Sequence, residues 1–365
     1  MGGEVVVYRY AGQARAAHGA AQSVGAPLLM VAAVNDAQGR SVALDVWASL
    51  RERLVRDGVG RLYACALPGH ASAEALERAI DVALADAGAP ALILLAYGDA
   101  AAHVRDYVGR GEGDHRVRLL IGLEGRYATH ALSYLEGGLW QTGDEAASAA
   151  LAGPDGAGAD LALGAPLIDR FVMVNVYGYA RDSIANEATR DVAPLPEAIN
   201  LGLHLPPGEV LDSPAVYEGL RPFLRGGFWV VRLQLVSFQM RAAAPGAPIG
   251  QFYFEVGGQR VPPRGAFAPP DEAAHAFARY TPLGTVALLE NKAAANVNLR
   301  LRELGRAAAQ RRTLFTTLHV PLAHGSASDH VMQDSFGSEI RVRVHCVRVP
   351  EMVSVNHDGG TRNAG

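Results

Sequence analysis

The chain has 365 residues, of which 49% are hydrophobic, and its 33 basic and 37 acidic residues give a net charge of −4. The length predicts two domains, or three, and the composition predicts a globular protein rather than a disordered or fibrous chain. No apolar run approaches the ~20 residues that cross a bilayer, and the N-terminus carries Glu4 where a signal peptide carries bases, so we expect a cytoplasmic protein that does not contact membranes.

Strand-like and helical patterns alternate through the first third of the chain, which favours a parallel sheet covered by helices on both faces. The predicted fold class is therefore α/β, with an N-terminal Rossmann-like or flavodoxin-like domain over residues 1–146. The expected strands are 4–10, 27–35, 61–67, 90–97 and 116–123, and the expected helices are 44–56, 72–87 and 100–109.

Ligands of such sheets bind outside the carboxyl ends of the strands. None of the loops there reads G-x-G-x-x-G or G-x-x-x-x-G-K-[ST], so we expect no dinucleotide fingerprint and no P-loop nucleotide. A hydrolase or transferase acting through these loops is one reading of this half. The residues expected at the carboxyl ends are Gly12, Gln13, Asn35, Asp36, Gly69, His70, Gly98, Asp99, Glu124 and Arg126.

An Ala- and Gly-rich segment with a Pro-Asp-Gly turn signal, residues 147–164, is the predicted linker. An α+β domain with antiparallel strands is expected over 165–356, followed by a tail over 357–365. The strands at 227–240 and 251–256 are separated by a Pro/Gly-rich turn and are expected to pair as a hairpin. Cys65 and Cys346 lie in apolar runs and are predicted to be reduced core residues.

Lys292 is the only lysine among the 33 basic residues, in a composition typical of a GC-rich bacterial coding sequence. Lysine differs from arginine because its pKa responds to burial. The run 285–289 is strand-like, so Glu290 and Lys292 would follow Val286 on one face. A helix is expected next, because apolar residues recur at helical spacing over 297–308, and a strand is expected over 313–322.

An acid after a proline, a strand ending in Glu-x-Lys, a helix and a further strand resemble the core of the PD-(D/E)xK nucleases over residues 271–322. The resemblance implies that Asp271 and Glu290 bind Mg²⁺ or Mn²⁺ and that Lys292 orients the attacking water. Carboxylate oxygens suit such hard cations, which stabilise a phosphodiester under attack.

Asp271 departs from this pattern, because residues 271–277 read as the first turns of a helix in which an acid is favoured by the dipole. Glu255, in the preceding strand-like run, is the substitute metal ligand. The alternative for Glu290 and Lys292 is a solvated ion pair without a catalytic role.

The charge of the chain is uneven. Residues 1–220 carry 16 arginines and 27 acids, a net −11, whereas residues 221–352 carry 15 arginines, one lysine and nine acids, a net +7. A basic C-terminal half is expected to contact nucleic acid, to contact the acidic half, or to be a plain solvated surface. The first function predicted is thus a metal-dependent nuclease or phosphodiesterase with an N-terminal ligand- or partner-binding domain. The second is a non-catalytic assembly subunit of a homo-oligomer.

Overall fold

The computed structural model describes residues 7–10, 26–34, 46–59, 61–68, 73–109, 115–125, 171–179, 195–206, 208–242, 247, 249–261, 266–267, 269, 271–276, 282–290, 292–304 and 312–352. The predicted linker and tail lie outside these ranges. Among the residues described, no helix combines the length and hydrophobicity needed to cross a bilayer.

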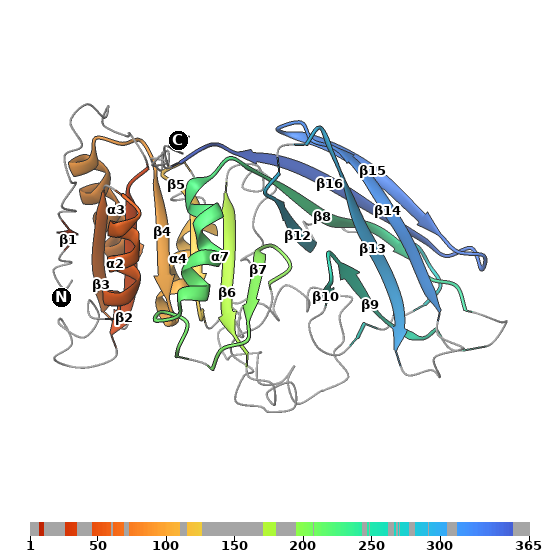
Figure 1. The fold of residues 1–365 in the computed structure, drawn as a ribbon. Helices are drawn as coiled ribbons and strands as arrows, with labels where there is room; N and C mark the ends of the chain where they lie inside the picture. The colour runs from red at the N-terminus through yellow and green to blue at the C-terminus, as the bar shows by residue number, and fades with distance from the viewer. Residues whose placement is uncertain are drawn as a thin grey trace, which may run out of the picture.

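A seven-stranded sheet forms the first part of the molecule, with the order β1-β3-β2-β4-β5-β6-β7 (Figure 1). Strand β1 is antiparallel to β3, and the other strands are parallel. The strands are β1 (Val7–Tyr10), β2 (Leu28–Val34), β3 (Leu62–Pro68), β4 (Leu92–Tyr97), β5 (Val117–Leu123), β6 (Val172–Gly178) and β7 (Ile199–Leu203).

Helices cover both faces of this sheet, because its strands are apolar on both sides. Along β2, Leu28 and Met30 pack toward α2 (Ala48–Arg56) and α7 (Pro214–Arg225). The alternate residues Leu29 and Val31 pack toward α3 (Ala73–Ala87) and α4 (Asp99–Gly109). The α/β class and the expected parallel sheet are confirmed. The parallel strands, numbered along the chain, lie in the order 2-1-3-4-5-6, which extends the flavodoxin-like order and differs from the Rossmann order 3-2-1-4-5-6.

The sheet continues past residue 146, where the first domain was predicted to end, because β6 pairs with β5 and β7 pairs with β6. The antiparallel part begins at β8. It is formed by β8 (Phe228–Gln239), β9 (Gln251–Val256), β10 (Gln259–Val261), β11 (His275–Ala276), β12 (Pro282–Leu288), β13 (Ala294–Leu304), β14 (Thr313–Pro321), β15 (Ser326–Gln333) and β16 (Glu339–Val349).

These strands form two sheets packed face to face around one apolar core. One has the order β10-β9-β13-β14, and the other has β11-β8-β16-β15 with β12 also pairing with β8. The antiparallel strands of the second half are confirmed. The predicted hairpin is wrong, because β8 pairs with β16 and β9 pairs with β13, in different sheets.

Strands β8 and β16 join the two parts of the molecule (Figure 1). The first residues of β8, Phe228 and Val230, and the last of β16, Val347 and Val349, belong to the core under α2 and α7. The middle of both strands belongs to the core between the antiparallel sheets. A side-chain contact also crosses the junction, because the Thr285 hydroxyl donates to the carbonyl of Pro196 at 3.0 Å.

Candidate ligand site at the carboxyl edge of the parallel sheet

The parallel sheet has one topological switch point, between β2 and β4, where the chain leaves two neighbouring strands in opposite directions. Open α/β sheets bind ligands in the crevice that such a switch point creates at the carboxyl ends. Trp47 precedes α2, Tyr97 ends β4, and Glu124 follows β5. Sheet topology thus brings these three side chains to the carboxyl edge.

Glu124 is a buried carboxyl group in an uncommon backbone conformation. Its φ is 48° and the residue is 9% exposed. The backbone N–H of Gly208 donates to Glu124 Oε1 at 2.8 Å, and the Tyr97 hydroxyl is a second partner. Burial raises the pKa of Glu124 above its ordinary value, although the two hydrogen bonds act in the opposite direction. A non-glycine residue at positive φ is strained, and such positions gather at functional sites.

Trp47 packs against Tyr97, the residue whose hydroxyl is hydrogen-bonded to Glu124. The two rings meet edge to face, with centroids 6.3 Å apart and planes at 75°. Trp47 is fully buried, and its indole Nε1 has no hydrogen-bond partner among the residues described. Buried indole N–H groups usually find an acceptor, and within the described ranges this one has none.

Three further rings stand at the ends of β6 and β7. Tyr179 and His204 meet edge to face with centroids 5.7 Å apart. The ring of Tyr177 lies over Gly202, where an added Cβ would come within 3.1 Å of it. Burial, followed by the neighbouring Tyr179, raises the pKa of the Tyr177 hydroxyl, which therefore stays protonated at neutral pH. Aromatic side chains and hydroxyl groups thus surround the edge.

A sharp turn from a strand into a helix can carry a nucleophile, and β4 leads into α4 through such a turn. Gly98 occupies the turn with φ 59°, and Asp99 is the first residue of the helix. Among the described residues at the carboxyl ends of β3 to β7, there is no serine, threonine or cysteine. The geometry therefore supports binding, and Asp99 is the only group at this turn that could act as a nucleophile.

Sequence reasoning reached part of this edge. Gly98, Asp99 and Glu124 were expected at carboxyl ends and are found there. Trp47 and Tyr97 were missed, because a single ring in an apolar run is indistinguishable from an ordinary core residue. The other expected residues, Gly12, Gln13, Asn35, Asp36, Gly69, His70 and Arg126, lie outside the described part of the chain.

The predicted nuclease residues do not form one metal site. Glu290 and Lys292 follow the end of β12 in a loop, and their side chains are 73% and 67% exposed. They form an ion pair with each other. The strand stops at Leu288, and Leu289 after it is already 52% exposed, so the pair lies in solvent rather than on a strand face. Lys292 holds the pKa of Glu290 below its usual range.

The two other predicted metal ligands are engaged elsewhere. Asp271 accepts from the Ala273 N–H at 2.8 Å and lies 2.9 Å from His275 Nε2. Glu255 lies on β9, 3.0 Å from Arg302 Nε. Within the described ranges, no three His, Cys, Asp or Glu residues form a group that could hold a metal ion. The expected helix at 271–277 is also wrong, because residues 275–276 pair with β8.

No family model and no curated relative matches the chain. Solved structures similar to it include a lipase from Bacillus licheniformis, BlEst2, in its propeptide form (TM-score 0.39, 10% identity, covering 87% of this chain and 96% of that chain). Est1E from Butyrivibrio proteoclasticus has a TM-score of 0.35 at 13% identity, covering 60% and 93%. A C2 domain has a TM-score of 0.22 at 11% identity, covering 33% and 98%. Likeness at this level assigns no activity.

Neither function predicted from sequence is retained. The comparisons return lipases and esterases where the sequence predicted a nuclease or an assembly subunit. The geometry opposes the nuclease independently, since Glu290 and Lys292 pair in solvent and both Asp271 and Glu255 have other partners. The nuclease prediction was wrong because the Glu-x-Lys motif is short and is satisfied by an ordinary surface ion pair.

Proposed function

We propose that the protein binds a small, neutral organic molecule bearing a carbonyl group at the carboxyl edge of the parallel sheet. The observation that supports this proposal is the buried Nε1 of Trp47, a hydrogen-bond donor with no acceptor in the described part of the chain. It stands beside Tyr97, which joins it to Glu124.

The chemistry of the lining favours a neutral ligand over an anion. Glu124 is buried, and its raised pKa reflects the cost of a charge at this place. A carboxylate ligand would add a second negative charge there, whereas the carbonyl of an ester, amide or ketone accepts from Trp47 without charge. The rings of Tyr97 and Tyr177 provide the apolar surface that small-molecule sites use.

The experiment is a calorimetric screen of esters, amides and ketones against the whole chain. We expect at least one to bind, and we expect Trp47→Phe to weaken it about tenfold, as loss of one buried hydrogen bond predicts. Trp229→Phe is the matched control, because the Nε1 of Trp229 on β8 also has no partner in the described residues but its ring lies under Arg348 of β16. The proposal would be refuted if both substitutions weakened ligand binding equally, or if the wild type bound none of the compounds.

Hydrolysis is a second candidate, supported by the position of Asp99. It follows the positive-φ Gly98 directly at the strand–turn–helix, and a carboxylate can act as a covalent nucleophile. In hydrolases whose nucleophile lies at such a turn, the catalytic acid and histidine follow the nucleophile in the chain, as Glu124 and His204 follow Asp99. The test is turnover of p-nitrophenyl esters by the wild type and by Asp99→Asn. Turnover that Asp99→Asn abolishes would favour hydrolysis, and binding without turnover would leave the binding proposal alone.

A further inference from the structure

The outer face of the four-stranded sheet carries side chains that are unlike those of its inner face. Along β9 and β13, Phe252, Phe254, Leu299 and Leu301 point inward and are buried. Because side chains alternate along a strand, the residues between them point outward. We call this surface the outer face. It comprises Tyr253, Glu255, Arg260, Asn296, Asn298, Arg300, Arg302, Phe315, Thr317 and His319.

The outer face is positively charged within a chain of net charge −4. Arg260, Arg300 and Arg302 contribute three positive charges and Glu255 one negative charge, a net +2. Glu255 Oε2 lies 3.0 Å from Arg302 Nε and 3.9 Å from Arg300 Nη1, so one acid is shared between two arginines. The remaining charge is complementary to a polyanion.

Aromatic rings lie among these arginines. Phe315 is 55% exposed on β14, so its ring is accessible from solvent. The strand register places Arg300 directly opposite it, with the guanidinium 5.1 Å from the ring centroid. The guanidinium of Arg260 on β10 lies 4.1 Å from the centroid of Tyr253 on β9. Rings and guanidinium planes are the surfaces on which nucleobases stack.

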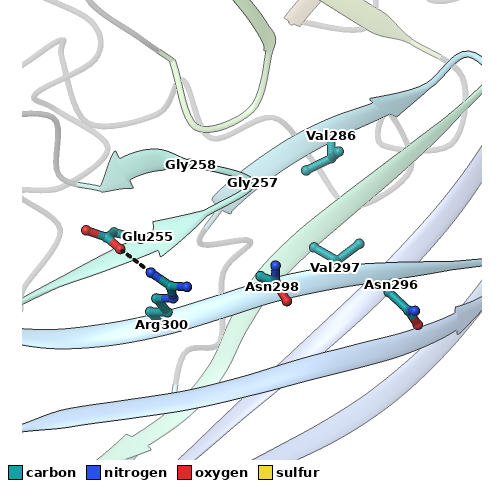
Figure 2. A pocket seen from close by; sticks show the side chains of 8 residues that line it. All are labelled: Glu255, Gly257, Gly258, Val286, Asn296, Val297, Asn298 and Arg300. Carbon is teal, nitrogen blue, oxygen red and sulfur yellow. Dashed lines mark ion pairs between the residues drawn. The ribbon is translucent and has the colours of Figure 1, made fainter.

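A pocket opens where β9 ends and β13 runs on, and Arg300, the partner of Phe315, is one of its lining residues (Figure 2). Its volume is about 320 Å³, and its walls include Asn296, Asn298 and Arg300. Thr317 donates to Asn298 Oδ1 at 2.9 Å, and the amide nitrogen of Asn298 points into the pocket (Figure 2). Carboxamides offer both donors and acceptors, as the edge of a nucleobase does.

The turn that closes this pocket depends on glycine. Gly257 and Gly258 both have positive φ, at 55° and 86°. A Cβ on Gly257 would come within 3.0 Å of Val286 on the opposite wall. The turn therefore packs closely against Val286 of β12, another lining residue of the pocket.

We propose that the outer face binds single-stranded nucleic acid. Phosphates lie along Arg260, Arg300 and Arg302, one base stacks on Phe315, and the edge of a neighbouring base enters the pocket at Asn298. This function is independent of the small-molecule site at the parallel sheet and involves no bond cleavage.

The experiment measures the anisotropy of a labelled oligothymidylate of about 15 nucleotides, a length within the range that one such surface covers. Three neutralised phosphates at ~0.7 counterions each predict a slope of about −2 for log K against log salt. We expect Phe315→Ala to weaken binding about tenfold with the slope unchanged, because it removes stacking and no charge. Arg300→Gln with Arg302→Gln should reduce the slope to about −0.7.

The controls repeat both changes away from the outer face. Phe336→Ala removes a 48% exposed ring that lies under Arg312, and Arg343→Gln removes a charge paired with Asp329. Both should bind as the wild type does, and thermal unfolding should show all variants folded. Absence of binding at low salt would overturn the proposal, and so would equal weakening of binding by Phe315→Ala and Phe336→Ala. The proposal would also fail if Phe315→Ala bound the oligonucleotide as tightly as the wild type does and heparin displaced the oligonucleotide. Binding of a neutral glycan without binding of the oligonucleotide would also overturn it.

Discussion

Arg105 of α4 and Glu197, two residues before β7, form an ion pair of 2.5 Å with side chains only 5% and 6% exposed. The pair joins two elements that reach the carboxyl edge. Helix α4 begins at Asp99, directly after the turn that holds Gly98, and β7 leads to His204. Because a buried ion pair tolerates little movement, it fixes α4 relative to β7 at a distance from the carboxyl edge.

Glu197→Gln should therefore destabilise the protein strongly. The substitution keeps the size of the side chain but leaves the guanidinium of Arg105 buried without its counter-charge, which typically costs about 3–5 kcal/mol. Denaturant unfolding measures the difference. Replacing both residues by methionine should recover most of the loss, because two apolar side chains leave no buried charge. A Glu197→Gln variant as stable as the wild type would show that the pair is solvated in solution.

The carboxyl group of Glu124 should make stability depend on pH. Its pKa is raised in the folded protein, so the folded state holds the proton more tightly than the unfolded chain. Its contribution is fully present below the unfolded pKa of ~4.3 and is lost as pH rises through the folded pKa. Glu124→Gln cannot ionise, so its stability relative to the wild type should rise across that window. The measurement is denaturant unfolding of both proteins from about pH 4 to neutrality, and a constant difference across that range would refute the assignment.

The parallel half of the fold was predictable because its strands and helices differ strongly in pattern. Strand β4 reads as an unbroken apolar run, Leu92–Tyr97, and α3 carries apolar residues at helical spacing. The carboxyl edge followed from alternation alone, so Gly98 and Glu124 were placed correctly. Trp47 was not predicted, because its role depends on which strand lies beside β4, and local sequence patterns do not determine the order of strands in a sheet.

The antiparallel half was harder to predict, because one segment fits both the helical and the strand periodicity of apolar residues. In β13, Val297 and Leu301 are four residues apart and also fit a helix, which is why a helix was expected. The intervening Leu299 is buried and Asn298 and Arg300 point outward, so the period of two is the one the structure adopts. Pairing with β9 and β14 on both sides stabilises this choice. Local sequence does not contain that tertiary information.

Cys65 should be inert to thiol reagents in the folded protein. It lies inside β3 with no exposed surface, and burial raises the pKa of its thiol to about 12. Since the thiolate is the reactive form, we expect Cys65 to be labelled only after the protein unfolds. The test is the rate of reaction with a chromogenic disulfide in native buffer and in denaturant, followed by mass spectrometry to locate the label. Labelling of Cys65 in native buffer at the rate of an exposed thiol would contradict the placement of β3.

Gly226 should be intolerant of any side chain, because it closes the junction between α7 and the antiparallel part. It ends the helix with φ 70°, and a Cβ there would stand 2.0 Å from the carbonyl oxygen of Pro350. The backbone N–H of Met352 donates to the carbonyl of Arg225 at 2.8 Å, so the two segments are held at this distance. Gly226→Ala adds both a clash and a strained φ, and we expect it to lower the free energy of unfolding by at least ~1–3 kcal/mol.

Gly219→Ala is the control: it lies within α7, where a Cβ meets no atom within 4 Å, and alanine favours a helix. Denaturant unfolding should therefore show Gly226→Ala destabilised and Gly219→Ala unchanged or stabilised, and equal stability of the two variants would mean that α7 and the end of β16 are not joined as closely as this contact requires.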